Sequence, residues 1–134
     1  MSDATPVVLL VDDSAAIRSI LKVYLAPLGV QTVDSDRGDR ALQALRLMPV
    51  SLVIADVNMP GMDGVSFVKA VRSLAEADLR QTPIVLLTAS SDANLRDTAL
   101  KAGADVFLQK PVDSAHFVAI VRRFLHPGSP PPPT

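Results

Sequence analysis

The sequence contains no cysteine, carries almost no net charge and has no long apolar run. The absence of cysteine excludes disulfide bonds and thiolate metal sites. A formal charge of −1 gives no electrostatic reason to expect binding to nucleic acid or to an anionic membrane. No run approaches the ~20 apolar residues that span a bilayer, and residues 1–6 lack the basic and apolar segments of a secretory signal. We therefore expect a cytoplasmic protein that acts away from membranes.

The 134 residues instead show a regular alternation of short apolar runs and longer amphipathic stretches. This pattern is typical of repeated β-α units around a parallel sheet. We predict a doubly wound α/β fold, with a five-stranded parallel sheet and helices on both faces. The expected strands are 7–11, 30–33, 52–55, 84–87 and 106–109, of which 30–33 is the weakest.

Helix limits are indicated by residues that cap free amides and by the glycines and prolines that end helices. Five helices are expected, and the fourth has the thinnest apolar stripe. They run from Asp13 or Ser14 to Gly29, over 39–48, onward from Gly64, from Ser91 or Asp92 to Gly103, and over 113–125.

The segment 127–134 differs from the rest of the chain because it consists mostly of proline. Such a segment cannot form a core and should be extended or disordered. We therefore place the domain at residues 1–126 and interpret 127–134 as a tail or a truncated linker. A ligand for an aromatic groove is the alternative, and only the run of prolines favours it.

Five chemically active side chains stand where the expected strands end. Asp12 and Asp13 follow the first strand, Asp56 follows the third, Thr88 the fourth and Lys110 the fifth. Because the carboxyl ends of parallel strands meet at one edge of the sheet, these side chains should converge in one pocket.

The expected pocket suits phosphoryl chemistry. Converging carboxylates hold one another's pKa up unless a cation lies among them. Mg²⁺ fits, since it takes oxygen ligands and keeps waters that bridge to phosphate oxygens. Lys110 adds a positive charge and Thr88 a hydroxyl. An unpaired carboxylate there is a candidate nucleophile toward phosphorus, because phosphoryl transfer mainly requires positioning and charge neutralisation.

Most of these residues also have a structural explanation when each is taken alone. The Asp12-Asp13 pair could end a strand and cap a helix, Thr88 could form a turn, and Lys110 could be solvated. Asp56 is harder to explain, because aspartate is unfavourable at the end of a buried strand without a partner. Residues given no site role are Asp63, expected in a turn, and His116 and His126, away from the strand ends.

Four motifs follow apolar runs in a fixed order along the chain. They are Val-Asp-Asp-Ser at 11–14, Asp56 with the loop Val57-Asn58-Met59-Pro60-Gly61-Met62-Asp63-Gly64, Thr88-Ala89, and Lys110-Pro111. Together they resemble the response regulator receiver domain. The resemblance covers nearly the whole chain to about Leu125 and implies the flavodoxin-like (βα)5 fold known as CheY-like.

The resemblance implies a metal and phosphoryl site. Asp56 would be the phosphoacceptor and would also bind Mg²⁺. Asp13 would bind the ion directly, Asp12 largely through water, and Asn58 through its backbone carbonyl. The donor would be a sensor histidine kinase or a histidine phosphotransfer protein.

The resemblance also implies a switch. Lys110 would contact the phosphoryl group, Thr88 would reorient toward it, and Phe107 would move into the space that Thr88 vacates. A cis bond between Lys110 and Pro111 is typical of the family. The best-known members carry tyrosine where this chain has Phe107, which cannot hold an inward rotamer through a hydroxyl. Partners would be bound on the face of the fourth helix, fifth strand and fifth helix.

We expect a two-component signalling switch that controls a downstream protein, with no direct binding to nucleic acid or membrane. It could be a stand-alone regulator, a phosphorelay intermediate, or the receiver portion of a larger regulator or hybrid kinase.

A Mg²⁺-dependent phosphatase usually carries a second aspartate two residues after its nucleophile. This chain has Asn58 there, so we expect no enzyme acting on an external substrate. In the family that this chain resembles, the residues at the positions of Asn58 and Ser90 influence how fast the phosphoryl group is lost. A binding module that is never phosphorylated would lack acidic or lysine members, and all are present.

Overall fold

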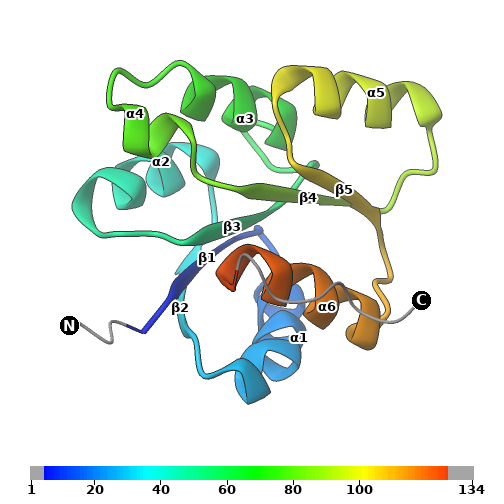
Figure 1. Ribbon diagram of the computed structural model, residues 1–134. Coiled ribbons are helices and arrows are strands. Elements are labelled where there is room, and N and C mark those ends of the chain that lie inside the picture. The colour runs from blue at the N-terminus through cyan, green and yellow to red at the C-terminus, as the bar shows by residue number, and fades with distance from the viewer. Residues whose placement is uncertain (1–4, 127–134) are drawn as a thin grey trace.

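The computed structural model describes residues 5–126 and contains one five-stranded parallel sheet (Figure 1). The order across the sheet is β2-β1-β3-β4-β5, so the chain reverses its direction of winding at β1 and β3. The predicted sheet is therefore confirmed, while segment 127–134 lies outside the described residues. The strands are β1 Val7–Val11, β2 Gln31–Ser35, β3 Leu52–Asp56, β4 Ile84–Thr88 and β5 Val106–Gln109.

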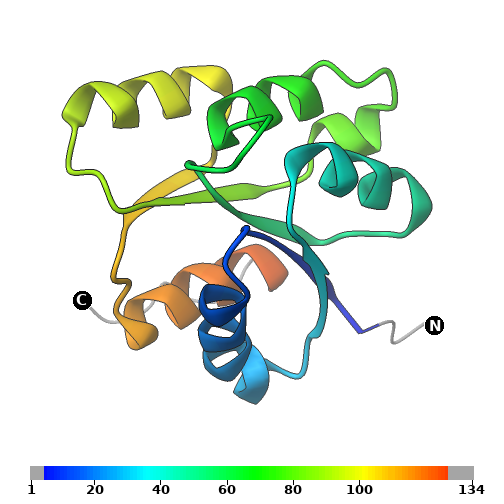
Figure 2. The ribbon, with the colours of Figure 1, turned by 180° about the vertical axis from the view of Figure 1, so that it is seen from behind.

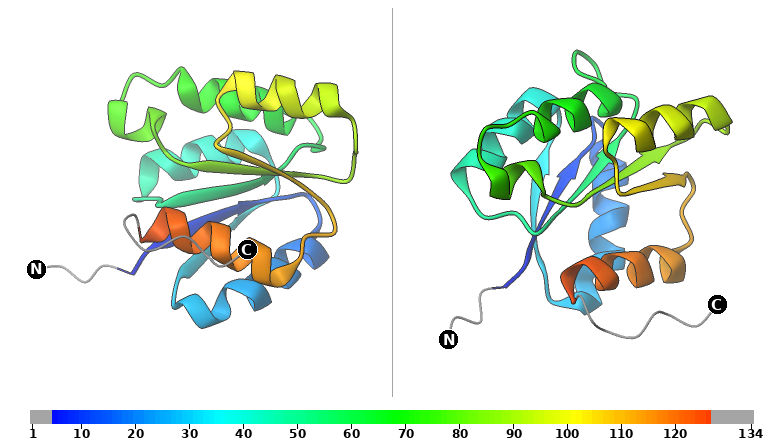
Figure 3. Two further views of the ribbon diagram at one scale, coloured as in Figure 1. Left: turned by 45° about the vertical axis from the view of Figure 1, so that its right-hand side comes forward. Right: turned by 45° about the horizontal axis from the view of Figure 1, so that its top comes forward.

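Helices cover both faces of the sheet, as the prediction requires. One face carries α2, α3, α4 and α5, and the other carries α1 and α6 (Figures 1, 2 and 3). Within residues 5–126, no helix is long and apolar enough to cross a membrane. The helices are α1 Ala15–Leu25, the 3-10 turn η1 Ala26–Leu28, α2 Gly38–Leu47, α3 Gly64–Arg72, α4 Ala77–Arg80, α5 Ala93–Ala102 and α6 Ser114–Leu125.

The core forms two layers because alternate strand residues point to opposite faces of the sheet. Along β1, Leu9 and Val11 pack with the buried residues of α2, α3 and α5. Val8 and Leu10 pack on the other side with α1 and α6. The central strands β3 and β4 are buried along their whole length. Their ends are thereby fixed on both faces of the sheet.

Two elements, α1 and β2, differ clearly from their predicted limits. Gly29 ends the first helical segment as expected, in a left-handed conformation, but the α-helix itself ends at Leu25. The last turn before Gly29 is the 3-10 turn η1, because Pro27 cannot donate an α-helical hydrogen bond. Strand β2 covers Gln31–Ser35 rather than 30–33. It is an edge strand that pairs only with β1 in the described sheet, and Gln31 is exposed, so its limits have little apolar signal.

The short helix α4 is an addition to the five predicted helices, and the fourth and fifth of these correspond to α5 and α6. Four residues are too few to show a helical period. Arg72, at the end of α3, donates to the carbonyl of Arg80 at 2.8 Å and to that of Thr82 at 2.7 Å. It also pairs with Asp105 at 2.9 Å. Arg72 therefore ties α4 to the start of β5, at the edge of the sheet where the strands begin.

Candidate functional site

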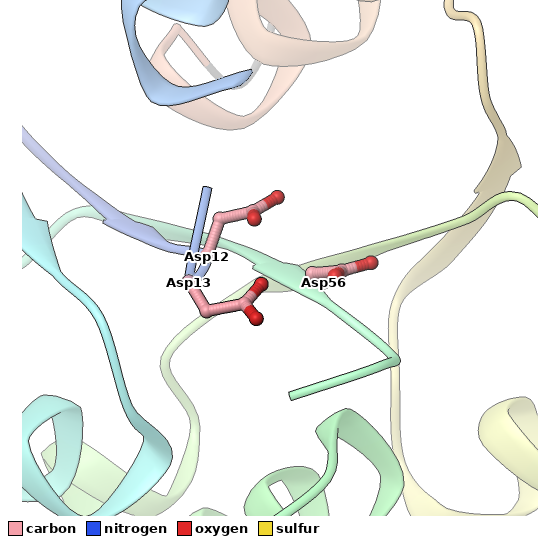
Figure 4. Close-up of side chains that lie close together, drawn as sticks. All are labelled: Asp12, Asp13 and Asp56. Carbon is pink, nitrogen blue, oxygen red and sulfur yellow. The ribbon is translucent and has the colours of Figure 1, made fainter. Parts of the chain in front are cut away.

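The carboxyl ends of the strands bring four of the predicted site residues together. Asp12 follows β1, Asp56 ends β3, and Lys110 follows β5. Pairing of Val11 with Ala55 places the ends of β1 and β3 side by side. The carboxylates of Asp12, Asp13 and Asp56 lie close together at this edge (Figure 4). One oxygen from each of the three lies within 4.8 Å of the other two.

The three carboxylates differ in their exposure to water. Asp12 is 2% exposed and Asp56 is 6% exposed, whereas Asp13 lies on the surface. Oδ1 of Asp12 accepts a hydrogen bond from the backbone N–H of Ser14 at 2.8 Å. Ser14 in turn caps α1 by accepting from the N–H of Ile17 at 3.2 Å. The start of α1 therefore fixes one buried carboxylate.

Lys110 lies between the two buried carboxylates. Its Nζ is 3.1 Å from Oδ1 of Asp56 and 3.3 Å from Oδ2 of Asp12. The backbone N–H of Lys110 donates to the carbonyl of Thr88 at 2.6 Å. The predicted cis peptide between Lys110 and Pro111 is confirmed. One cation thus partly neutralises two carboxylates that are withdrawn from water.

Burial raises the pKa of Asp56 above the usual aspartate range. The hydrogen bond and the positive charge of Lys110 lower it, but not enough to cancel the cost of burial. The neighbouring charge of Asp12 raises it further, and the backbone N–H of Asn58 lowers it slightly. Three carboxylates share this cluster with the single ammonium of Lys110, and this excess of negative groups favours a hard divalent cation with oxygen ligands.

Thr88 and Phe107 lie on neighbouring strands beside the acidic cluster. Thr88 is fully buried at the end of β4, and its Oγ1 accepts a hydrogen bond from the N–H of Ser90 at 3.0 Å. Phe107 on β5 is 7% exposed and belongs to the core layer formed with α2, α3 and α5. Its ring is therefore already largely covered, and its predicted inward movement stays a prediction. The predicted ligand Asn58 is exposed in the loop after β3.

These features match a known family of domains. Residues 8–122 match the family model of the response regulator receiver domain. The chain belongs to this family. Its fold is correspondingly CheY-like and flavodoxin-like, as the resemblance implied, and the domain is a receiver of two-component signalling.

Three similar proteins illustrate the relationship. The sensor histidine kinase GacS of Pseudomonas protegens is 35% identical over 125 residues, which are 92% of this chain and 14% of the kinase. The chemotaxis protein CheY4 of Vibrio cholerae is 32% identical with a TM-score of 0.81, covering 90% of this chain and 99% of that chain. The receiver domain of the histidine kinase PA1611 from Pseudomonas aeruginosa is 27% identical with a TM-score of 0.80, covering 91% and 98%.

The receiver domain is short beside its curated relatives. It spans between 14% and 48% of the length of the sensor kinases and transcriptional regulators that it matches. This chain therefore corresponds to only one part of each of those proteins.

The residues excluded from the site lie in structural positions. Asp63 caps α3 by accepting from the N–H of Ser66 at 2.8 Å. His116 and His126 are exposed on or after α6.

Two residues beside the site were not identified from the sequence. Gly64 was noted only as a loop glycine, yet a Cβ there would lie 2.6 Å from the carbonyl oxygen of Asp56. Arg18 bonds to the backbone of Asp12. An arginine on a helix gives no sequence signal for such a bond, whereas a glycine next to a strand-end loop is a cue for close backbone approach.

Proposed function

We propose that this receiver accepts a phosphoryl group on Asp56 from a sensor histidine kinase or a histidine phosphotransfer protein. The observation that carries the proposal is the position of the Lys110 Nζ, 3.1 Å from a buried Asp56 carboxylate that shares its pocket with Asp12 and Asp13. A carboxylate in this setting is oriented and poorly solvated, which are the conditions for attack on phosphorus.

The proposed transfer requires few groups. A carboxylate oxygen of Asp56 attacks phosphorus, and the new O–P bond forms as the P–N bond to the donor imidazole breaks. The imidazole nitrogen takes up a proton. Lys110 neutralises the negative charge on the phosphoryl oxygens, and the Thr88 hydroxyl donates to one of them. Phosphorylation and later hydrolysis at Asp56 are the only reactions proposed, with no external substrate turned over.

We further propose that Mg²⁺ binds at this site. The donor set fits, because Asp12, Asp13 and Asp56 supply oxygen ligands that approach within 4.8 Å and are not fully balanced by Lys110. The backbone carbonyl of Asn58 would complete the protein ligands. The related PA1611 receiver was solved with magnesium coordinated in its active-site cleft. When bound, the ion would supply charge neutralisation at the phosphoryl oxygens.

Output is proposed to pass through the face formed by α5, β5 and α6. Thr88 would give up its bond with the Ser90 N–H when it turns to the phosphoryl group, and the space would be available to Phe107. Among the described residues of α5, only Ala99 is fully packed into the core, whereas the other helices of nine or more residues each bury at least two side chains. A small change beside β5 can therefore shift its position.

A downstream protein, with no direct contact to nucleic acid or membrane, is the proposed reader of this face. The domain is proposed to act as a stand-alone regulator, a phosphorelay intermediate, or the receiver portion of a larger regulator or hybrid kinase. We propose a cytoplasmic location, where it would meet the kinase. The domain limits of 1–126 and the role of segment 127–134 stay predictions.

Mass measurement after incubation with a small-molecule phosphodonor and Mg²⁺ tests the proposal. We expect one phosphoryl group on the wild type and none on Asp56→Asn, which lacks the nucleophile. Asp63→Asn is the matched control, because Asp63 lies in the same loop but caps α3, and it should be phosphorylated like the wild type. Equal phosphorylation of Asp56→Asn and the wild type would reject Asp56 as the acceptor.

A further inference from the structure

The ion pair between Arg18 of α1 and Asp34 of β2 is connected to the backbone of the acidic cluster. Arg18 donates through Nη1 to the backbone carbonyl of Asp12. Its Nε donates to Oδ2 of Asp34, on β2, at 2.9 Å. A guanidinium group presents these donors in one rigid plane. Arg18 therefore joins α1, the end of β1 and the edge strand β2.

The hydrogen bond from Arg18 to the carbonyl of Asp12 matters because this carbonyl belongs to the peptide unit that joins Asp12 to Asp13. The carbonyl of Asp12 and the N–H of Asp13 belong to one planar peptide unit, so fixing the carbonyl fixes this plane between the two carboxylates. The N–H of Asp12 is held separately, by donating to the carbonyl of Ser35 on β2 at 3.0 Å. Since Asp12 is only 2% exposed, Arg18 also gives its carbonyl a partner where water has little access.

We infer that Arg18 is a positioning residue for the site: it holds the Asp12–Asp13 peptide so that both carboxylates face the metal and the phosphoryl group. Asp34 holds Arg18 in turn. This inference rests on the proposed function. Outer-shell residues that orient metal ligands commonly change metal affinity about 10- to 100-fold when they are replaced. We expect an effect near the lower end, because Ser14 and Lys110 still hold the Asp12 side chain.

Lys22 provides a matched control on the same helix. Its Nζ pairs with Oδ1 of Asp34 at 2.8 Å, while Arg18 pairs with Oδ2. Among the described residues, however, no hydrogen bond joins Lys22 to Asp12. Lys22→Met removes a positive charge and an ion pair to the same carboxylate but leaves the Asp12 carbonyl held. A purely structural role of the Asp34 ion pairs would make the two variants alike.

The test compares Mg²⁺ binding by the wild type, Arg18→Met and Lys22→Met, with the dissociation constant taken from amide NMR shifts at residues 11–14 and 56–58. We expect Arg18→Met to weaken binding about tenfold and to shift the Asp12 carbonyl ¹³C resonance. Lys22→Met should change the dissociation constant less than twofold and leave that resonance in place. Urea unfolding of each variant reports its stability, and Arg18→Gln replaces Arg18→Met if the latter does not fold.

The outcomes separate this inference from the proposed function. If the wild type binds Mg²⁺ and the Arg18 variant binds it equally well, the positioning role is wrong and the proposed function stands. Equal weakening in the Arg18 and Lys22 variants also rejects a specific role for the Asp12 carbonyl bond. If the wild type itself shows no Mg²⁺-dependent shifts, the proposed metal site fails and the inference fails with it.

Discussion

The Nζ of Lys110 lies 3.1 Å from Oδ1 of Asp56, and the same ammonium is 3.3 Å from Oδ2 of Asp12. A single side chain from the loop after β5 thus links the carboxylates that end β1 and β3. Each of the two carboxylates is less than a tenth exposed, so the ion pairs are shielded from water. This relationship makes Lys110 the main protein cation of the proposed phosphoacceptor site.

Replacing Lys110 by methionine should slow the phosphorylation of Asp56 without preventing folding. The variant lacks the cation that faces the phosphoryl oxygens, and the loss of such a group typically costs about 10²- to 10³-fold in rate. The rate of mass increase with a small-molecule phosphodonor measures the effect. Lys69→Met, on the exposed side of α3, is the control and should match the wild type. Wild-type rates in the Lys110 variant would remove this residue from the mechanism.

Gly64→Ala should disturb the loop after Asp56. The new Cβ would lie 2.6 Å from the Asp56 carbonyl oxygen and 2.7 Å from Cα of Val57, so the backbone must shift. We expect a loss of about 1–3 kcal/mol in unfolding free energy and phosphorylation slowed at least about tenfold. Urea unfolding and mass measurement report the two effects.

Gly38→Ala is the control for the Gly64 prediction. Gly38 also begins a helix, but the nearest atoms to its new Cβ would belong to the side chain of Met62, with Sδ at 3.0 Å and Cβ and Cγ at 3.2 Å, and not to backbone. A shift of a few tenths of an ångström in Met62 would relieve these contacts, which is less than the backbone at Gly64 requires. Equal losses in the two alanine variants would show that the close approach of Gly64 to Asp56 has no special importance.

The ion pairs of Asp34 should make part of the stability dependent on pH. Burial alone would raise the pKa of Asp34, but the hydrogen bonds and charges of Lys22 and Arg18 outweigh it and hold the pKa below the usual range. A carboxyl group with a lowered folded-state pKa stabilises the fold above its unfolded pKa, and this contribution is lost as pH falls through the folded value.

We therefore expect Asp34→Asn to be less stable than the wild type near neutral pH, with the difference shrinking below about pH 4. Urea unfolding midpoints between neutral pH and pH 3 measure it. The exposed neighbour Asp36 serves as a control, since Asp36→Asn leaves both ion pairs of Asp34 intact. A difference between Asp34→Asn and the wild type that stays constant down to pH 3 would contradict the sign of the pKa shift.

A beryllofluoride mimic of the aspartyl phosphate should change hydrogen exchange between Thr88 and Phe107. We expect the largest change in α5, which has little buried side-chain support, and little change in α1, α2 and α3. The Asp56→Asn variant should show no response to the mimic. Unchanged exchange from Thr88 to Phe107 in the wild type would place the output on another surface.

The fold could be predicted because its determinants are local and repeated. The apolar runs 52–55 and 84–87 lie in strands that are buried along their whole length, and the polar residues Asp56 and Thr88 end these strands at one edge of the sheet. The limits of β2 and the helix α4 could not be predicted, because an edge strand and a four-residue helix bury too little apolar surface to set a period. The convergence of Asp12, Asp13, Asp56 and Lys110 could be predicted because the carboxyl ends of adjacent parallel strands meet at one edge of a sheet.

The supporting contacts of the site depend on three-dimensional packing. Arg18 is one of several arginines on helices, and only the arrangement of α1 against β1 and β2 brings it to the Asp12 carbonyl. The close approach of Gly64 to Asp56 likewise depends on the first residue of α3 lying next to the end of β3. Spacing along the chain indicates which side chains share an edge, but it does not indicate which backbone atoms they contact.

The central claim is that Asp56 carries the phosphoryl group, and borohydride reduction of the phosphorylated protein tests it most directly. Borohydride converts an aspartyl phosphate to homoserine, so peptide mass mapping locates the modified residue. After phosphorylation with Mg²⁺ and a small-molecule phosphodonor, we predict homoserine at position 56, with Asp12 and Asp13 unchanged. Homoserine at position 12 or 13, or a phosphoryl group that survives reduction elsewhere in the chain, would contradict the account.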